Sequence, residues 1–217
     1  MEEALDALFK GPPLSLLSDA AGGLFLFHGD PALFALAPPL MSRRLHRGER
    51  VLFLDGDNRF DPYPIVESAK RAGKDPESFL ASIFVARAFT CHQMGTLILN
   101  QMAAGAARYR PRLILLASPL QTFYDEAVSY TEASRLLRRV GVQLRRTTRE
   151  KIRIVILSPS PPKTAQKRAS FLSFLKEQAD RVFSVGRSEE TLLITEERPA
   201  GVARPPLRQA AETREGQ

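Results

Sequence analysis

Five short runs of apolar residues recur along the middle of the chain, and this repetition constrains the fold more than any other feature of the sequence. The runs are LFLFH at 24–28, VLFLD at 51–55, IFVARA at 83–88, RLILLAS at 112–118 and IRIVILS at 152–158. Because neighbouring side chains in each run are both apolar, each predicts a strand buried on both faces, as in a parallel sheet. Amphipathic stretches at 92–108 and 131–149 separate several of the runs. The sequence therefore predicts an α/β domain with a doubly wound, mainly parallel sheet.

The end of the chain departs from this alternation. Runs at 181–186 and 191–195 flank the polar segment RSEE and predict a C-terminal β-hairpin. The residues that follow contain too few large apolar side chains to pack, which is typical of a disordered tail. We therefore divide the chain into an N-terminal segment, a core domain and a basic, polar tail. These parts span residues 1–18, 19–197 and 198–217.

Prolines supply two local predictions. Asp75 followed by Pro76 predicts a helix start, with Asp as the cap and Pro at the first helical position. Pro38 and Pro39 are expected to kink or end the first long helix, because proline lacks the backbone N–H group that a helix interior needs.

Charge and cysteine content narrow the choice of partner and compartment. The single cysteine, Cys91, cannot form an internal disulfide, and no apolar run reaches the roughly 18–20 residues that span a bilayer. We therefore expect a cytoplasmic protein without a membrane partner. The net charge of +7 is concentrated in residues 111–170, where twelve Lys and Arg residues accompany four Asp and Glu residues. This excess favours a polyanionic partner, although the preference for arginine can equally reflect a GC-rich genome.

The first candidate ligand site follows the run at 24–28. In an open parallel sheet, ligands bind beyond the carboxyl ends of the strands. A phosphate loop of the form G-x-x-x-x-G-K-[ST] uses glycines for close backbone approach, lysine for the phosphates and a hydroxyl for magnesium. Gly29 supplies the opening glycine here, but Phe34, Ala35 and Leu36 stand where Gly, Lys and Ser or Thr are required. The sequence predicts that this loop binds no nucleotide cofactor.

The segments resemble those of the RecA/RadA recombinase superfamily in their order and in their amino-acid sequence, especially those of the archaeal and eukaryotic RadA branch and its paralogues. The strongest stretch is VLFLDGDNRFDPYPIVESAKRAGKDPESFLASIFVARAFTCHQM at 51–94. It is similar to the family's strand with Asp-x-Glu, its Arg-Pro helix start, and its ARAF strand followed by His-Gln. The resemblance covers residues 19–197 in order and implies a RecA-type fold.

The resemblance also implies that the triphosphate site is degenerate. Ala35 and Leu36 replace the phosphate-binding Lys and the magnesium-binding Ser or Thr, and Ala117 replaces the magnesium-orienting Asp. Asp57 stands where the family's longer catalytic Glu activates water. With Gly29 and Phe34, these positions form the remnant of the site. We therefore expect neither a catalytic residue nor a cofactor.

Two DNA-binding loops of the family correspond to the segments after Ser118 and Ser158. The second segment is basic, and the resemblance makes Lys163, Lys167 and Arg168 the candidates for phosphate contact. The first segment holds Phe123 and Tyr124, which are candidates for stacking on exposed bases. A further group of basic residues lies mainly on the amphipathic stretch at 131–149, where a solvated helix face is the favoured interpretation. The group comprises Arg135, Arg138, Arg139, Arg145, Arg146, Arg149, Lys151 and Arg153.

Two other motifs favour ordinary structural roles. Asp55, Asp57 and Asp61 do not make a calcium loop, because Phe60 replaces the turn glycine and Val66 replaces the bidentate Glu, so no metal site is expected. The segment 34–37 resembles the Phe-x-x-Ala peptide that links subunits of RadA-type recombinases. Here it falls in the first crossover helix, so we expect it to pack in the core.

Together these features lead to the hypothesis of a non-catalytic, ATP-independent RecA-like accessory protein of recombination or repair. Its expected partners are single-stranded or branched DNA, a RecA/RadA-type recombinase or another repair protein, and homo-oligomers remain open. The alternative is a protein-interaction regulator of the SulA or ImuA type that does not bind DNA. An unconventional NTPase is the least favoured reading.

Overall fold

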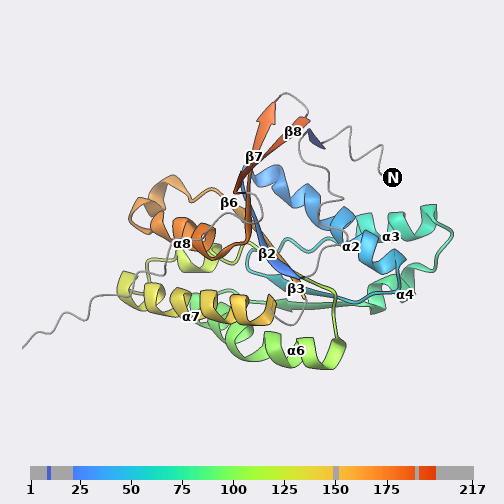
Figure 1. Cartoon of the computed structure of the whole chain (residues 1–217), viewed down its shortest axis with the longest axis horizontal. Coiled ribbons are helices and arrows are strands. Elements are labelled where there is room, and N and C mark those ends of the chain that lie inside the picture. The colour runs from blue at the N-terminus through green and yellow to red at the C-terminus, as the bar shows by residue number, and fades with distance from the viewer. Residues whose placement is uncertain (1–8, 11–21, 149–151, 189–190, 199–217) are drawn as a thin grey trace, which may run out of the picture.

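A computed structural model describes residues 9–10, 22–148, 152–188 and 191–198. Its strands form one eight-stranded sheet in the order β1-β8-β7-β2-β6-β5-β3-β4 (Figure 1). Every pairing is parallel except that between β7 and β8, which form an antiparallel hairpin. The strands are β1 (Phe9–Lys10), β2 (Gly23–Gly29), β3 (Val51–Asp55), β4 (Ile83–Arg87), β5 (Leu113–Ala117), β6 (Arg153–Pro159), β7 (Arg181–Ser188) and β8 (Thr191–Arg198). The predicted mainly parallel sheet and terminal hairpin are confirmed.

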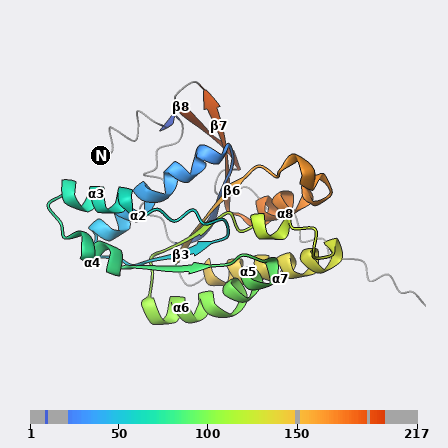
Figure 2. The same cartoon turned by 180° about the vertical axis from the view of Figure 1, so that it is seen from behind.

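Helices cover both faces of this sheet. The helices α2, α3 and α4 lie on one face, and α5 to α8 lie on the other (Figures 1 and 2). Three short segments are 3₁₀-helices, η2, η4 and η5, and η3 is a π-helix between α5 and α6. Their bounds are η2 (Pro31–Leu36), α2 (Ala37–His46), α3 (Tyr63–Arg71), α4 (Pro76–Ala81), α5 (Cys91–Thr96), η3 (Leu97–Gln101), α6 (Met102–Tyr109), η4 (Gln121–Phe123), α7 (Tyr130–Thr148), η5 (Lys163–Arg168) and α8 (Ser170–Gln178).

The core is divided in two by the sheet because strand side chains alternate between its faces. In β2, Leu24 and Leu26 pack under α5 to α8, whereas Phe25 and Phe27 pack under η2 and α2 to α4. The central strands β3, β5 and β6 divide their apolar residues in the same way. This double burial is the reason that the strands could be recognised as unbroken apolar runs.

The two proline predictions had different outcomes. The carboxylate of Asp75 accepts hydrogen bonds from the N–H groups of Glu77 and Ser78, which confirms the predicted helix start. The expectation that Pro38 and Pro39 end a helix is wrong, because α2 begins at Ala37 and the prolines lie in its first turn. At that position the missing N–H group removes no helical hydrogen bond.

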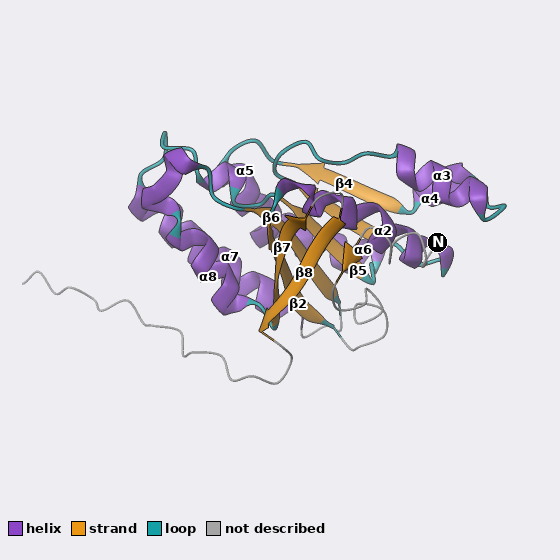
Figure 3. Ribbon diagram, turned by 90° about the horizontal axis from the view of Figure 1, so that it is seen from above, coloured by secondary structure: helices purple, strands orange, loops and turns teal. Residues whose placement is uncertain are grey.

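Two of the predicted parts lie largely outside the described residues. The N-terminal segment 1–18 contributes β1 at the edge of the sheet next to β8, and its other residues are not described. The predicted tail at 198–217 contributes only Arg198, the last residue of β8. Within the described part, α3 and α7 lie at opposite ends of the longest dimension (Figures 1 and 3).

Candidate functional site

The segment after β2 folds as the 3₁₀-helix η2 instead of an open phosphate loop. The Asp30 N–H group donates to the carbonyl oxygen of Val185 in β7 at 2.8 Å. The Asp30 side chain accepts a hydrogen bond from the Ala32 N–H group at 2.7 Å, and the Leu33 N–H group donates to the Asp30 carbonyl oxygen at 3.0 Å. A helix start is a natural site for an anion. Here the carboxylate of Asp30 already occupies it.

The side chains of η2 face in directions that do not suit a phosphate. Leu33 and Leu36 are fully buried and share one apolar cluster with Ala117. Ala35, which stands in the lysine position, is exposed. The positions that would carry the magnesium-binding hydroxyl and carboxylate therefore lie in the hydrophobic core.

Gly29 is required by the neighbouring strand. Its φ angle of 128° is one that other residues rarely adopt, and an added Cβ would lie 2.2 Å from the carbonyl oxygen of Val185. The Gly29 carbonyl oxygen accepts a hydrogen bond from the Ser160 N–H group at 2.9 Å. Close packing of β2 against β7 is sufficient to explain this glycine without a bound phosphate.

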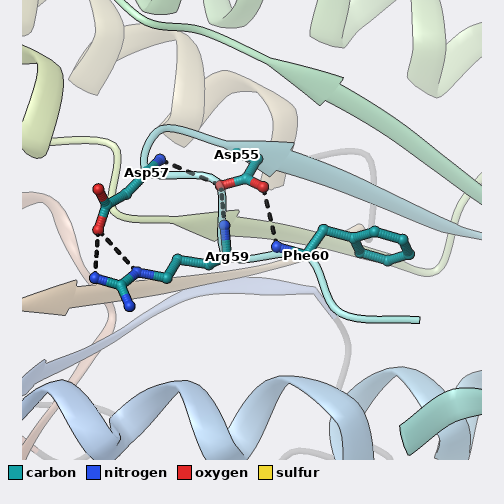
Figure 4. A network of polar contacts seen from close by, with 4 residues as sticks. All are labelled: Asp55, Asp57, Arg59 and Phe60. Carbon is teal, nitrogen blue, oxygen red and sulfur yellow. Dashed lines mark hydrogen bonds and ion pairs between the residues drawn. The ribbon is translucent and has the colours of Figure 1, made fainter. Parts of the chain in front are cut away.

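Asp55 organises the loop that follows β3 (Figure 4). Its side chain has 0% exposure, and Oδ1 accepts hydrogen bonds from the N–H groups of Asp57 and Arg59 at 3.2 and 2.9 Å. Its Oδ2 accepts one from the Phe60 N–H group at 3.0 Å and lies 3.6 Å from Nε of Arg87. The carboxylate is therefore committed to its own loop. In the described ranges, no group of three or more His, Cys, Asp or Glu side chains is arranged to hold a metal ion.

Asp57, which the resemblance places at the position of the catalytic Glu, is paired with a cation of its own chain. Arg59 reaches its Oδ2 with Nε at 2.8 Å and with a terminal guanidinium nitrogen at 2.6 Å (Figure 4). The same guanidinium lies over the Phe34 ring at 4.8 Å from its centroid. Arg59 thus links Asp57 to Phe34, two remnant positions that the sequence could not place together. No sequence motif singles out Arg59.

The ends of β3 and β5 are joined by backbone contacts. The Gly56 N–H group donates to the Ala117 carbonyl oxygen at 2.8 Å. An added Cβ at Gly56 would lie 2.5 Å from the Ser118 carbonyl oxygen. The strand ends where the family's metal-orienting carboxylate is expected are therefore in direct backbone contact.

The segment 34–37 packs as expected. Phe34 packs against the core cluster under η2 and α2, and Ala37 is buried within that cluster. The predicted core role of this Phe-x-x-Ala sequence is confirmed.

Three of the five candidate DNA contacts are buried, so the expectation that they face solvent is wrong. Phe123 and Tyr124 are only 1% and 8% exposed and belong to the core under α5 to α8. Burial also raises the pKa of the Tyr124 phenol above its usual value. Arg168 is 5% exposed and donates to the carbonyl oxygens of Phe123 and Val128. These two bonds hold η5 against the segment after β5.

The remaining two candidates are accessible. Lys163 and Lys167 are exposed on η5. The structure places a different aromatic residue, Tyr130, beside this segment: its hydroxyl lies 3.1 Å from Oγ of Ser170, and its ring stacks on Phe171 at 5.3 Å. Tyr130 is 47% exposed and lines a groove of about 230 Å³ between α7 and α8. It takes the surface position that was expected of Phe123 and Tyr124.

A second groove lies along the edge of the sheet. Strand β4 is the last in the order and, among the described strands, pairs only with β3. The groove has a volume of about 480 Å³ between β4 and the η3–α6 segment. Apolar side chains from both elements line it, including Phe84, Val85 and Met102, while Arg108 lies at its polar side. The sequence contains no local signal for this groove, because its walls come from separate elements.

None of the helices in the described ranges is long and apolar enough to cross a membrane.

A family model described as Rad51 matches residues 40–157, just over half of the chain. The matched range runs from α2 to β6 and contains the Asp55 loop, the β4 edge and α7. It leaves out the capped helix η2 and the basic segment η5.

Proposed function

The chain belongs to the Rad51 family of RecA-like recombination and repair proteins, and we propose that within this family it is an ATP-independent accessory protein that acts by binding. The observation that carries the proposal is the state of η2. Its N-terminus is capped by the Asp30 carboxylate, and its buried side chains Leu33 and Leu36 fill the place of the triphosphate machinery.

Electrostatics supports the absence of hydrolysis. Phosphoryl transfer depends on cations and N–H groups that compensate the charge of the triphosphate and of its transition state. Here the helix start presents the negative charge of Asp30, and the guanidinium of Arg59, which lies over Phe34, is paired with Asp57. A bound triphosphate would have to break both arrangements before it gained any contact.

Calorimetric titration of the protein with ATP and Mg²⁺ tests this part of the proposal. We expect no saturable heat and no phosphate release, with an ATP-hydrolysing recombinase of the same family as the positive control. Micromolar affinity together with turnover that is lost in Asp57→Ala would instead establish the unconventional NTPase.

For DNA, we propose that the edge formed by η5 and the start of α7 contacts a single strand. Lys163 and Lys167 provide mobile cations for phosphates, and Tyr130 provides a partly exposed ring on which a base could stack. Lys163→Gln with Lys167→Gln should weaken single-strand binding and flatten its salt dependence by about 1.4 units at roughly 0.7 per contact. Unchanged affinity and slope would remove this contact from the proposal.

For protein partners, we propose that the groove beside β4 receives an extended segment of a family recombinase. An edge strand offers unpaired backbone groups to such a segment, and the adjoining apolar groove can take its aromatic side chain. A synthetic Phe-x-x-Ala peptide is the probe, because this is the peptide that links subunits in recombinases that the sequence resembles.

Two substitutions on α6 test whether the peptide binds in this groove or elsewhere on the helix. Ala104 is exposed and lines the groove, whereas Ala107 is exposed on the same helix without lining it. Ala104→Glu should lower peptide affinity at least tenfold, whereas Ala107→Glu should leave it unchanged. Equal effects of the two substitutions would contradict a groove-specific contact.

The groove also supports the second candidate function, a protein-interaction regulator without DNA binding. The two readings differ in one observable. If the protein binds neither single strand nor duplex at low salt and still binds recombinase after nuclease treatment, the regulator reading replaces the accessory DNA-binding protein.

A further inference from the structure

Helix α7 carries a row of arginines on one face over three turns. Two of them follow the first by three and four residues, and the last two follow that pair by seven residues, which is two helical turns. All five side chains therefore lie on the same side of the helix, about 16 Å from first to last at 1.5 Å per residue. Four of them are exposed and Arg145 is half-buried. The row consists of Arg135, Arg138, Arg139, Arg145 and Arg146.

These guanidinium groups are not neutralised by the parts of the protein around them. Within the described residues, no hydrogen bond or ion pair engages any of the five guanidinium groups. Glu132, in the first turn of α7, lies 3.4 Å from His92 and precedes the row. From α8, Glu177 lines the groove beside Arg138. In the described part of the chain, five arginines thus lie near two carboxylates, which leaves the row with a net positive charge.

We propose that this arginine row binds the phosphate backbone of double-stranded nucleic acid without reading its sequence. The proposal rests on the DNA-binding function proposed above, but it uses a surface distinct from Lys163 and Lys167. Guanidinium groups present a planar fork of donors that matches phosphate oxygens. A duplex carries about one negative charge per 1.7 Å of its axis, so a row of about 16 Å faces enough phosphates to engage every arginine.

The form of the row favours a duplex over a single strand. The helix is continuous over 19 residues, so its cations keep a fixed spacing that suits the regular backbone of a duplex. Within the row, the exposed large apolar side chain is Val142, which offers no ring on which an unpaired base could stack. The exposed ring, Tyr130, lies at the start of α7 beside η5. Duplex and single-strand contacts would therefore meet where α7 and α8 touch.

The test compares matched substitutions at opposite ends of the molecule. The α7 variant carries Arg138→Gln, Arg139→Gln and Arg146→Gln. The control carries Lys70→Gln, Arg71→Gln and Lys74→Gln, which remove the same number of exposed positive charges at the end of α3 (Figure 1) and in the segment that follows it. Fluorescence anisotropy with a blunt duplex of mixed sequence, and with one of its separated strands, is recorded over a range of salt concentrations.

We expect the α7 variant to bind the duplex at least about tenfold more weakly at low salt and to lose about 2.7 units of salt slope, at roughly 0.9 per phosphate contact. The control variant should keep both values. Thermal unfolding of both variants should match that of the wild type, because the substituted residues are exposed.

Several results of these measurements would overturn the proposal. They are a wild type that binds no duplex at low salt, an α7 variant that keeps the wild-type affinity and slope, and equal losses in the two variants. A duplex loss confined to the Lys163 and Lys167 variant would also reject it, while leaving the proposed single-strand function intact. Loss of an acidic protein partner without loss of duplex binding would assign the row to protein contact instead.

Discussion

Two regions of the molecule differ in whether their charged side chains have partners within the protein. The first, the corner, is formed by η2 and the loop after β3, and the second, the basic face, is formed by η5 and α7. At the corner, Asp30, Asp55 and Asp57 each accept hydrogen bonds or ion pairs from their own chain. On the face, Lys163, Lys167 and four of the five arginines of the α7 row are exposed to solvent. The charges of the corner are therefore satisfied within the protein, whereas the exposed cations of the basic face can reach a polyanion.

The largest expected effect comes from restoring a charge at the corner. Ala117→Asp would place a carboxylate in the apolar cluster with Leu33 and Leu36, which should lower the free energy of unfolding by about 3 kcal/mol. Urea denaturation measures this loss. Ala35→Lys, at an exposed position of the same site, is the control and should change the free energy of unfolding by less than about 0.5 kcal/mol.

The combined variant Ala35→Lys, Leu36→Thr and Ala117→Asp tests the same site for activity. It should not bind or hydrolyse ATP, because the backbone of η2 stays capped by Asp30. Hydrolysis at a rate like that of an active recombinase would mean that the corner retains a phosphate loop.

A second large loss of stability is expected at Arg168, which is the buried basic residue of η5. Arg168→Ala leaves two carbonyl oxygens, those of Phe123 and Val128, without their donor, so the free energy of unfolding should fall by about 3 kcal/mol. Lys167→Ala, at the exposed neighbour, should cost less than about 0.5 kcal/mol. Thermal and urea unfolding measure both, and equal costs would contradict the distinction between a buried and a surface cation.

The cap of η2 should have a moderate effect. Asp30→Ala removes the acceptor of the Ala32 N–H group and should lower the free energy of unfolding by about 1 kcal/mol. Asp30→Asn keeps a side-chain oxygen and should retain most of the stability. Similar losses in the two variants would show that the negative charge, and not the cap, stabilises this corner.

The smallest effect is expected at the ion pair of Asp57 with Arg59. The two side chains are 29% and 43% exposed, so solvent screens their attraction. Arg59→Gln should lower the free energy of unfolding by less than about 1 kcal/mol, and added salt should reduce this difference further. A loss that persists in high salt would assign the effect to the contact between Arg59 and Phe34 instead.

The sequence was a good guide to the sheet and a poor guide to its surface. All five apolar runs became strands, because burial on both faces leaves a local pattern that needs no knowledge of neighbours. The helix start at Asp75 was recognised because its cap bonds to residues two and three positions ahead. Whether a loop side chain is buried leaves no such local pattern in the sequence. For that reason the burial of Phe123, Tyr124 and Arg168 was not predicted.

By itself, the sequence determined the α/β class and the resemblance to the recombinase superfamily, and it led to the hypothesis that the lysine, hydroxyl and carboxylate positions of a triphosphate site hold other residues. Only the tertiary structure decided what fills that space and which cations reach solvent. Arg59 meets Phe34 across two segments, and Arg168 meets carbonyl oxygens about forty residues earlier in the chain. Such contacts depend on how the strands are ordered in the sheet, which local propensity and periodicity do not specify.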